Sequence, residues 1–293
     1  MEAAHRQRPV HALLLLGDNF YPNGLLESEL AARIAMNVVR PYCRFADLSA
    51  PRSAEVEHAC GVARDARQPI PILAVLGNHD DDSDFPESAL LQKEAVRDFV
   101  ANWEMPRDAI AVRELGQGVS LILLQSMDLV RNRKLLQALP QAIRSAAGPW
   151  RILVAHHPLL PTDTAEAHGP FEVDYMERAQ EAIRAAGVPV QLSLAGHHHS
   201  LQILESIPPV PPLQVVSGAG SRAPRAPVEL PGVRFAAQRN GFARVDLVEG
   251  EAEEHLVVSL YVTRSVWLPG GRPELVTRWS IALDGAARQE SMP

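Results

Sequence analysis

Near the start of the chain, an apolar run ends at a group of polar residues: residues 11–21 read HALLLLGDNFY. Three later segments have the same design, since residues 70–80 read IPILAVLGNHD, residues 151–158 read RILVAHHP and residues 190–199 read VQLSLAGHHH. Each apolar run has the length and composition of a buried strand. In open α/β sheets, ligands bind beyond the carboxyl ends of the strands, where successive loops meet. The four segments therefore predict one polar site at one edge of a sheet.

Strands and helices are predicted to alternate along the first two thirds of the chain. The predicted strands are 11–16, 70–76, 119–124, 151–155, 190–195 and 213–216. The segments 27–39, 88–103, 133–147 and 172–186 carry apolar residues at three- and four-residue intervals, which predicts amphipathic helices, and residues 1–8 resemble the tail of a helix. This alternation indicates an α/β layered fold.

The final third of the chain changes character. Pro-rich loops at 207–213 and 223–231 lead into strand-like runs at 243–248, 255–262 and 276–283. Successive strands without helices normally pair antiparallel, so we expect residues 243–293 to supply strands of a mixed second sheet that packs against the first. A chain of 293 residues can bury a substantial core, and we predict a single domain over residues 1–293.

Composition and charge exclude several classes of protein. Apolar residues make up 46% of the chain, as in ordinary globular proteins. A net charge of -7 without a basic run argues against a nucleic-acid scaffold. No apolar run approaches the roughly 20 residues of a membrane-spanning helix, so we expect no membrane partner. The first residues lack the features of a signal peptide, so the chain as it stands predicts a cytoplasmic protein.

Cys43 and Cys60 are the only cysteines, and they do not form a CxxC pair. Their number and spacing leave two interpretations open. We favour free structural thiols over a single disulfide formed in an oxidising compartment.

Carboxylate, amide, phenol and imidazole groups follow the four apolar runs. Together they suit a metal such as Fe, Mn or Zn. Each segment alone has a plainer explanation, because an Asp after a strand is commonly a turn former, Gly-Asn tolerates left-handed turns, and paired histidines are commonly solvated or packed. Four such segments at four strand ends, in a chain with 11 histidines, favour a metal site over turn chemistry.

The order GDNFY, GNHD, AHHP and GHHH resembles the metallophosphoesterase superfamily. The tyrosine three positions after the aspartate resembles the purple acid phosphatase branch, and within it the smaller tartrate-resistant acid phosphatase-like proteins. The likeness covers roughly residues 11–222. It implies a calcineurin-like sandwich of two mixed β-sheets flanked by helices, and a dinuclear site that holds iron together with iron, zinc or manganese.

The resemblance also implies a role for each polar residue. Asp18 would bridge the two metals, Tyr21 and His199 would bind the first metal, and Asn78, His156 and His197 would bind the second. His79 would protonate the leaving-group oxygen, while His168 and Asn78 would contact the substrate phosphate. His157 and His198 stand where the family varies, and we interpret them as pocket lining with a structural role.

One part of the family pattern is missing. The family has a further aspartate on a first strand, and no aspartate precedes Asp18 here. We favour a start that was set too late over a genuine short form, because a central strand is costly to omit. An upstream extension would allow a periplasmic or secreted protein. A genuine short form is expected to bind the second metal far better than the first and to hydrolyse phosphate esters poorly.

The leading hypothesis is a metallophosphatase that hydrolyses small phosphate monoesters with a metal-bound hydroxide. Two alternatives stay open. One is a phosphodiesterase or nucleotide hydrolase built on the same core. The other is a catalytically weak metal-binding relative, because the upstream aspartate is absent.

Overall fold

The computed structural model describes residues 2–81, 87–162, 169–207, 210–220, 230–250, 253–263 and 273–292. The chain divides into two compact units, which we call the N-terminal unit (residues 2–108) and the C-terminal unit (residues 109–293). The sheets and the main apolar cores each fall within one unit. The expectation of a single domain over residues 1–293 stays a prediction.

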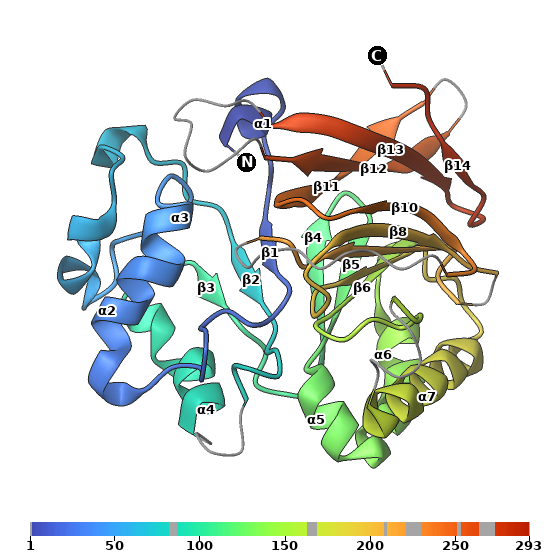
Figure 1. The fold of residues 1–293 in the computed structure, drawn as a ribbon, viewed down its shortest axis with the longest axis horizontal. Helices are drawn as coiled ribbons and strands as arrows, with labels where there is room; N and C mark the ends of the chain where they lie inside the picture. Colours follow the sequence, from blue (N-terminus) through green and yellow to red (C-terminus); the bar gives the residue numbers. More distant parts are fainter. Residues whose placement is uncertain are drawn as a thin grey trace. The chain divides into compact units, whose positions relative to one another are not determined.

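Three short parallel strands form the sheet of the N-terminal unit (Figure 1). They are β1 (Leu13–Leu15), β2 (Ile72–Ala74) and β3 (Trp103–Glu104), in that order across the sheet. Leu13 pairs with Ile72, which pairs with Trp103 on its other side. β2 is buried along its whole length because it lies between the other two. The predicted strands at 11–16 and 70–76 are confirmed.

The helices of the N-terminal unit are short. The predicted helix at 27–39 is confirmed as η1 (Glu27–Glu29), α2 (Leu30–Ile34) and the π-helical turn η2 (Ala35–Val39), continued by α3 (Arg40–Tyr42). The other helical elements are α1 (Glu2–Gln7), η3 (Ser53–Glu55), η4 (Glu57–Ala59), η5 (Arg64–Ala66), α4 (Glu87–Glu94) and η6 (Val96–Asp98). Phe20, Ile34, Val38, Phe99 and Trp103 are buried together in the core. Burial of each such side chain stabilises the fold by about 1.5–3 kcal/mol, so apolar packing holds the helices to the sheet.

Cys43 and Cys60 form a disulfide, and their Cα atoms are 5.1 Å apart. Cys43 follows α3 and Cys60 follows η4, so the bond joins the ends of two helical segments. The expectation of free thiols is therefore wrong, and the alternative of a single disulfide is correct. Pairing depends on the distance between the two Cα atoms in the fold, which cysteine number and spacing do not reveal.

Loss of the disulfide is expected to destabilise the N-terminal unit. The two cysteines are 17 positions apart, and a cross-link over a loop of this length stabilises a protein by about 3 kcal/mol by restricting the unfolded chain. We expect the double variant Cys43→Ser/Cys60→Ser to lose about this much free energy of unfolding. Urea unfolding followed by circular dichroism measures the loss, and wild type treated with dithiothreitol is the control. An unchanged midpoint in both samples would show that the bond adds nothing to stability.

Seven strands form the main sheet of the C-terminal unit, in the order β10-β8-β9-β7-β6-β5-β4. They are β4 (Ile110–Gly116), β5 (Val119–Leu124), β6 (Trp150–Ala155), β7 (Leu192–Ala195), β8 (Leu201–Glu205), β9 (Leu213–Ser217) and β10 (Val233–Ala237). The central strands β5, β6, β7 and β9 are parallel, and the others pair antiparallel. The four central strands confirm the predictions at 119–124, 151–155, 190–195 and 213–216. They are buried along almost their whole length, as apolar runs covered on both faces should be.

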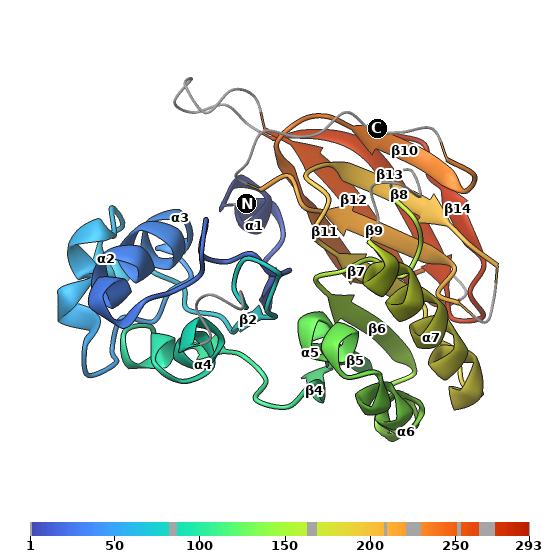
Figure 2. The same cartoon turned by 60° about the horizontal axis from the view of Figure 1, so that its bottom comes forward.

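Helices cover one face of this sheet (Figure 2). They are α5 (Ser126–Arg131), η7 (Arg133–Ala138), α6 (Leu139–Ser145) and α7 (Pro170–Ala186). Leu139, Tyr175 and Ile183 pack against Leu124 and Leu153 of the sheet, which confirms the amphipathic helices predicted at 133–147 and 172–186. No described helix combines the length and the apolar character that crossing a bilayer requires.

A second sheet of four antiparallel strands lies on the other face, where β11 contacts β9 (Figure 2). Its strands are β11 (Gly241–Glu249), β12 (Glu254–Val262), β13 (Glu274–Ala282) and β14 (Ala287–Gln289). The first three confirm the runs predicted at 243–248, 255–262 and 276–283. The predicted α/β class, with sheets flanked by helices, is thereby confirmed. The second sheet was expected to be mixed, and it is antiparallel throughout.

Candidate functional site

The loop after β1 turns sharply at Asp18. Gly17 and Asp18 have positive φ angles of 87° and 56°, a left-handed conformation that glycine tolerates and that aspartate adopts more readily than most residues. The phenol of Tyr21 donates a 2.5 Å hydrogen bond to Oδ2 of Asp18. Oδ1 of Asp18 accepts the backbone N–H of His79 at 3.0 Å. Both polar loops of the N-terminal unit therefore hold the Asp18 carboxylate.

His79 is oriented through its Nδ1 atom, which lies 2.7 Å from the carbonyl oxygen of Pro22. A carbonyl oxygen only accepts hydrogen bonds, so Nδ1 carries the hydrogen and donates it. The Tyr21 ring lies beside the imidazole, with the ring centroids 4.5 Å apart. His79 is partly exposed, and Nε2 is the atom left to exchange a proton with a bound molecule.

Asp80, to which the sequence analysis gave no role, fastens the two loops together. Its side chain is fully buried. Oδ2 accepts the backbone N–H groups of Asn19 and Gly77 at 2.9 and 3.0 Å, and Oδ1 accepts that of Phe20 at 3.0 Å. The side-chain amides of Asn19 and Gln92 donate two more hydrogen bonds. One carboxylate thus joins the loop after β1 to the loop after β2.

Side chains of the helical segment after η1 donate hydrogen bonds to the backbone of the Asp18 loop. Arg33 in α2 donates to the carbonyl oxygens of Tyr21 and Gly24. Asn37 in η2 donates to the carbonyl oxygen of Asn19 at 3.1 Å. Residues four positions apart lie on one face of a helix, so one helical face fixes the loop at several points.

The charge on Asp80 makes stability depend on pH. Burial and the neighbouring Asp18 carboxylate raise the pKa of Asp80 from 3.8 to about 6, although three backbone N–H groups lower it. Because the folded pKa is the higher one, the folded state binds the proton more tightly, and stability is lost as pH rises from about 4 to about 6.

The variant Asp80→Asn cannot titrate at this position and gives the reference for a pH experiment. We expect metal-free wild type to lose up to about 3 kcal/mol relative to this variant between pH 4 and pH 6, and little beyond it. Urea unfolding at several pH values measures the difference. A difference that stays constant with pH would show that Asp80 titrates at its ordinary pKa.

The C-terminal unit brings two histidine segments together because β6 and β7 are neighbouring parallel strands. Their pairing ends with Ala155 opposite Ala195, and the chain continues into His156 on one strand and Gly196 on the other. The Gly196 N–H donates to the His156 carbonyl oxygen at 3.0 Å, which extends the pairing by one step. Polar residues far apart in the sequence therefore leave the sheet side by side.

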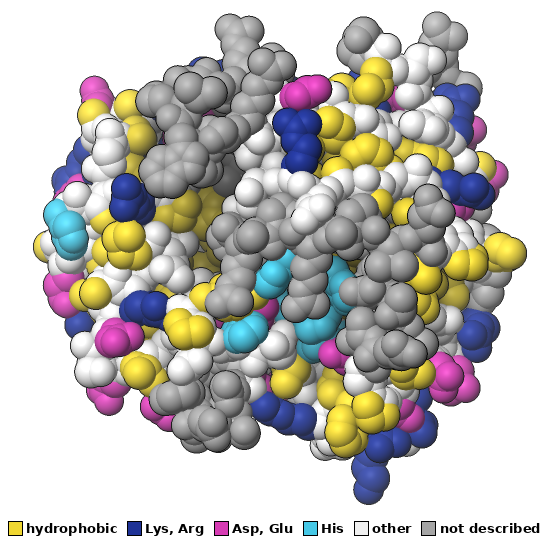
Figure 3. Space-filling view, viewed as in Figure 1, with side chains coloured by type: hydrophobic (Ala, Val, Ile, Leu, Met, Phe, Trp, Pro, Cys, Tyr) yellow, Lys and Arg dark blue, Asp and Glu magenta, His cyan; other side chains and the backbone are white. Residues whose placement is uncertain are grey.

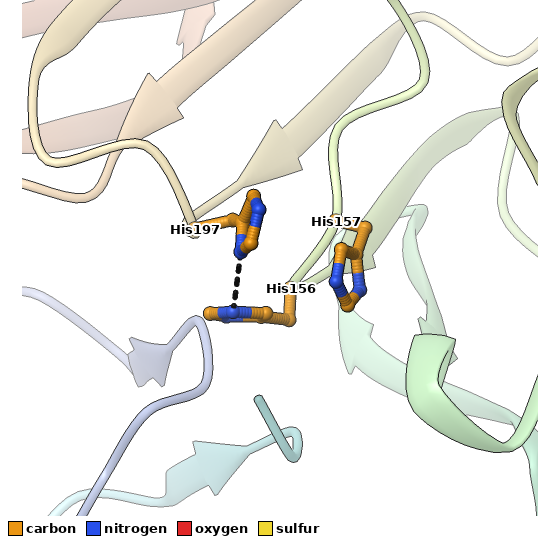
Figure 4. A group of neighbouring side chains, drawn as sticks. All are labelled: His156, His157 and His197. Carbon is orange, nitrogen blue, oxygen red and sulfur yellow. Dashed lines mark hydrogen bonds between the residues drawn. The ribbon is translucent and has the colours of Figure 1, made fainter. Parts of the chain in front are cut away.

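His156, His157 and His197 form a cluster at this edge (Figure 4), which we call the three-histidine cluster. One nitrogen from each ring lies within 4.8 Å of the other two. Nε2 of His156 and Nδ1 of His197 are 3.2 Å apart. His156 and His157 are 1% and 3% exposed, whereas the His197 side chain is 20% exposed. Histidine side chains are visible as a group on the face drawn in Figure 3.

Two polar side chains outside the cluster orient its rings. Ser126, at the start of α5, has its Oγ atom 2.9 Å from Nδ1 of His157 and accepts the backbone N–H of the same histidine at 3.2 Å. Glu172, in the first turn of α7, has Oε1 3.4 Å from Nε2 of His197. A polar partner on the outer nitrogen of a histidine fixes its tautomer and ring orientation. Neither Ser126 nor Glu172 was predicted as a site residue, because no local sequence pattern marks them.

The chain turns at His197, whose φ angle of 61° is uncommon for a residue other than glycine. His198 is 5% exposed and His199 is partly exposed. Within the described residues, the three-histidine cluster is the one group of three or more His, Cys, Asp or Glu residues close enough to share an ion. His199 does not belong to it.

Gly218 lies against the turn at His198, and a side chain there would disturb it. A Cβ atom at Gly218 would lie 2.0 Å from the carbonyl oxygen of His198, whereas one at Gly220 would meet nothing within 4 Å. We expect Gly218→Ala to cost about 2 kcal/mol of stability through overpacking, and Gly220→Ala to stay within about 0.5 kcal/mol. Thermal unfolding compares the two, and an equal loss in both variants would show that the turn adapts.

The predicted site residues divide between the two units. Asp18, Tyr21 and His79 contact one another in the N-terminal unit, and Asn78 lies next to His79 in the chain. His156 and His197 meet in the three-histidine cluster, together with His157, which the sequence analysis had set aside as pocket lining. His168 lies outside the described residues. The assignment of individual ligands stays a prediction.

The chemistry of the three-histidine cluster fits a metal ion. Imidazole nitrogens are common ligands of zinc, iron and copper. A carboxylate and a serine hydroxyl stand at the outer nitrogens of two of the rings, as is usual around metal-binding histidines.

The model of one protein family, the calcineurin-like phosphoesterases (Metallophos), matches residues 1–201. This chain belongs to the calcineurin-like phosphoesterase family. Membership implies metal-dependent hydrolysis of phosphoesters and the binding of divalent metal ions. The superfamily expected from the sequence motifs is thus confirmed, and the purple acid phosphatase branch stays a prediction.

Solved structures that resemble this one include PhoD and GAP50. PhoD aligns with a TM-score of 0.59 at 14% sequence identity, covering 96% of this chain and 66% of PhoD. GAP50, the anchor in the inner membrane complex of Plasmodium, aligns with a TM-score of 0.49 at 12% identity, covering 90% of this chain and 87% of that one. At such identity the likeness to PhoD shows a shared fold alone. No curated protein sequence matched this chain.

Proposed function

We propose that this protein hydrolyses phosphate monoesters at a dinuclear metal centre. The observation that carries the proposal is the three-histidine cluster in a chain of a phosphoesterase family. The proposed metal ligands are those that the sequence motifs suggest: Asp18, Tyr21, Asn78, His156, His197 and His199. When bound, two cations would polarise the phosphoryl group and acidify a water molecule for attack.

Two residues of the N-terminal unit suit the remaining roles, which are metal binding by a carboxylate and proton donation to the leaving group. The Asp18 carboxylate is already fixed by Tyr21 and by the backbone of His79, so little conformational freedom is lost when it binds a cation. His79 presents Nε2 because Nδ1 is held by Pro22. We assign to this nitrogen the proton that the leaving-group oxygen needs.

The experiment that tests the proposal uses the full chain, stripped with a chelator and reloaded with Mn²⁺, Zn²⁺ or Fe²⁺. Its substrates are 4-nitrophenyl phosphate and the diester bis(4-nitrophenyl) phosphate. We expect metal-dependent turnover of the monoester, which should fall at least about 100-fold in His156→Asn and persist in His58→Asn, an exposed position in the N-terminal unit. Turnover of the diester alone would replace the monoesterase with a phosphodiesterase. No turnover of either substrate with any metal would leave a metal-binding protein and overturn the proposal.

We also propose that the protein matures in an oxidising compartment, periplasmic or extracellular. The disulfide between Cys43 and Cys60 supports this, because such bonds are rare where thiol reductants are abundant. Alkylation of free thiols at the moment of cell lysis tests it, and two alkylated cysteines per chain would place the protein in a reducing compartment.

A further inference from the structure

The three-histidine cluster differs from the ligand set that the sequence motifs imply. Those motifs assign His156 and His197 to one metal and leave His157 aside. In the structure the His157 ring lies beside both of them, with its centroid 5.0 Å from that of His156 and 4.6 Å from that of His197. All three rings offer a nitrogen to one small region.

The hydrogen bonds of His157 determine which nitrogen it can offer. Ser126 Oγ lies 2.9 Å from Nδ1 and also accepts the backbone N–H of His157. A hydroxyl oxygen has two acceptor sites, so it can accept from Nδ1 as well and leave the lone pair on Nε2. Since Nδ1 is occupied, Nε2 is the atom of His157 that can bind an ion.

The ring of His197 is arranged in the same manner. His197 has its Nε2 atom 3.4 Å from the Glu172 carboxylate and its Nδ1 atom 3.2 Å from Nε2 of His156. The inner nitrogen of each oriented ring thus lies in the cluster, and its outer nitrogen faces a polar side chain. His156 and His157 are buried, so an ion held by them would be largely enclosed by protein.

We propose that His157 is a direct metal ligand, so that His156, His157 and His197 hold one ion through three imidazole nitrogens, with Ser126 and Glu172 as positioning residues. The inference rests on the proposed function only in taking this cluster as its metal site. Around a tetrahedral zinc ion about 2.1 Å from each ligand nitrogen, the nitrogens lie about 3.4 Å from one another. His156 and His197 already have nitrogens 3.2 Å apart, and the observed limit of 4.8 Å requires the His157 nitrogen to approach them by up to about 1.4 Å, which is within reach of small side-chain rotations. Three protein nitrogens leave the fourth position of a tetrahedral ion for water or substrate.

The test measures Zn²⁺ binding by the full chain without substrate. Affinity comes from competition with a chromophoric chelator, and X-ray absorption at the zinc edge counts the imidazoles on the first equivalent. The key variant is His157→Asn, because its side-chain amide can replace Nδ1 toward Ser126 while Nε2 is lost. We expect at least about tenfold weaker binding and one imidazole fewer. The matched control is His198→Asn, a buried histidine outside the cluster, which should keep the wild-type affinity and imidazole count.

A second variant covers the case in which His157→Asn fails to fold. Ser126→Ala keeps all three imidazoles and removes only the orienting hydroxyl, so Zn²⁺ affinity should fall about 10- to 100-fold with the imidazole count unchanged. Wild-type affinity and spectra in either folded variant would overturn the proposal. The experiment distinguishes failure of this inference from failure of the proposed function. A zinc site with three imidazoles but no phosphatase activity would overturn only the proposed function. Phosphatase activity and zinc binding that are unchanged in His157→Asn would overturn only the inference that His157 is a ligand.

Discussion

Asp80→Ala is expected to lower the free energy of unfolding of the N-terminal unit by about 4 kcal/mol at pH 7.5. The truncation leaves the buried backbone N–H groups of Asn19, Phe20 and Gly77 without their acceptor, and each such donor costs about 1–3 kcal/mol. It also removes a buried charge whose raised pKa reflects a cost of about 3 kcal/mol. The lost hydrogen bonds outweigh this gain, because two side-chain amides lose their acceptor as well. Urea unfolding at constant pH measures the result.

Two further variants separate the hydrogen bonds of Asp80 from its charge. Asp80→Asn keeps one acceptor oxygen, so it should lose about half as much stability as Asp80→Ala. Asp98→Asn removes a carboxylate from an exposed position of the same unit and should stay within about 0.5 kcal/mol of wild type. If Asp80→Ala unfolds no more readily than Asp98→Asn, water replaces the carboxylate. Arg33 and Asn37 would then be the main supports of the Asp18 loop.

The fold was predictable where a strand is a long apolar run. The central strands β5, β6 and β7 are such runs, and burial on both faces makes them visible in the sequence. The edge strand β4 was missed because it is half exposed and lacks a continuous apolar run. The helix predicted at 88–103 ends early, since α4 stops at Glu94 and Trp103 enters β3, where tertiary contacts override helical periodicity. One such contact is the hydrogen bond from the Trp103 indole to the Gln92 carbonyl oxygen.

The candidate site was predictable where chemistry follows a strand end directly. Asp18 and His156 could be found because each closes an apolar run in the sequence. Asp80 and Glu172 could not, because their roles depend on partners from other elements. The sequence alone likewise does not show which of two adjacent histidines, such as His156 and His157, faces the site. Only backbone geometry shows that His157 joins the three-histidine cluster.

His79→Asn is expected to lower kcat on alkyl phosphates by about 100- to 10,000-fold, the usual loss when a general acid is removed. The asparagine amide can replace Nδ1 as the donor to Pro22, which in wild type is a 2.7 Å contact, so the loop should keep its conformation while Nε2 is lost. The alkoxide leaving group is a strong base and needs that proton. The 4-nitrophenolate ion leaves without one, so kcat on 4-nitrophenyl phosphate should fall less than about tenfold.

The contrast between the two leaving groups identifies the role of His79. A residue that only binds the phosphate or shapes the loop affects both substrates alike, because they share the phosphoryl group, and it changes KM rather than kcat. Equal losses on the alkyl and the aryl ester would therefore remove His79 as the proton donor and make it a phosphate contact. Metal content measured on each sample separates either outcome from simple loss of the ions, since the backbone N–H of His79 also holds Asp18. A substitution of the side chain alone leaves that hydrogen bond in place, so His79→Asn should bind as much metal as wild type.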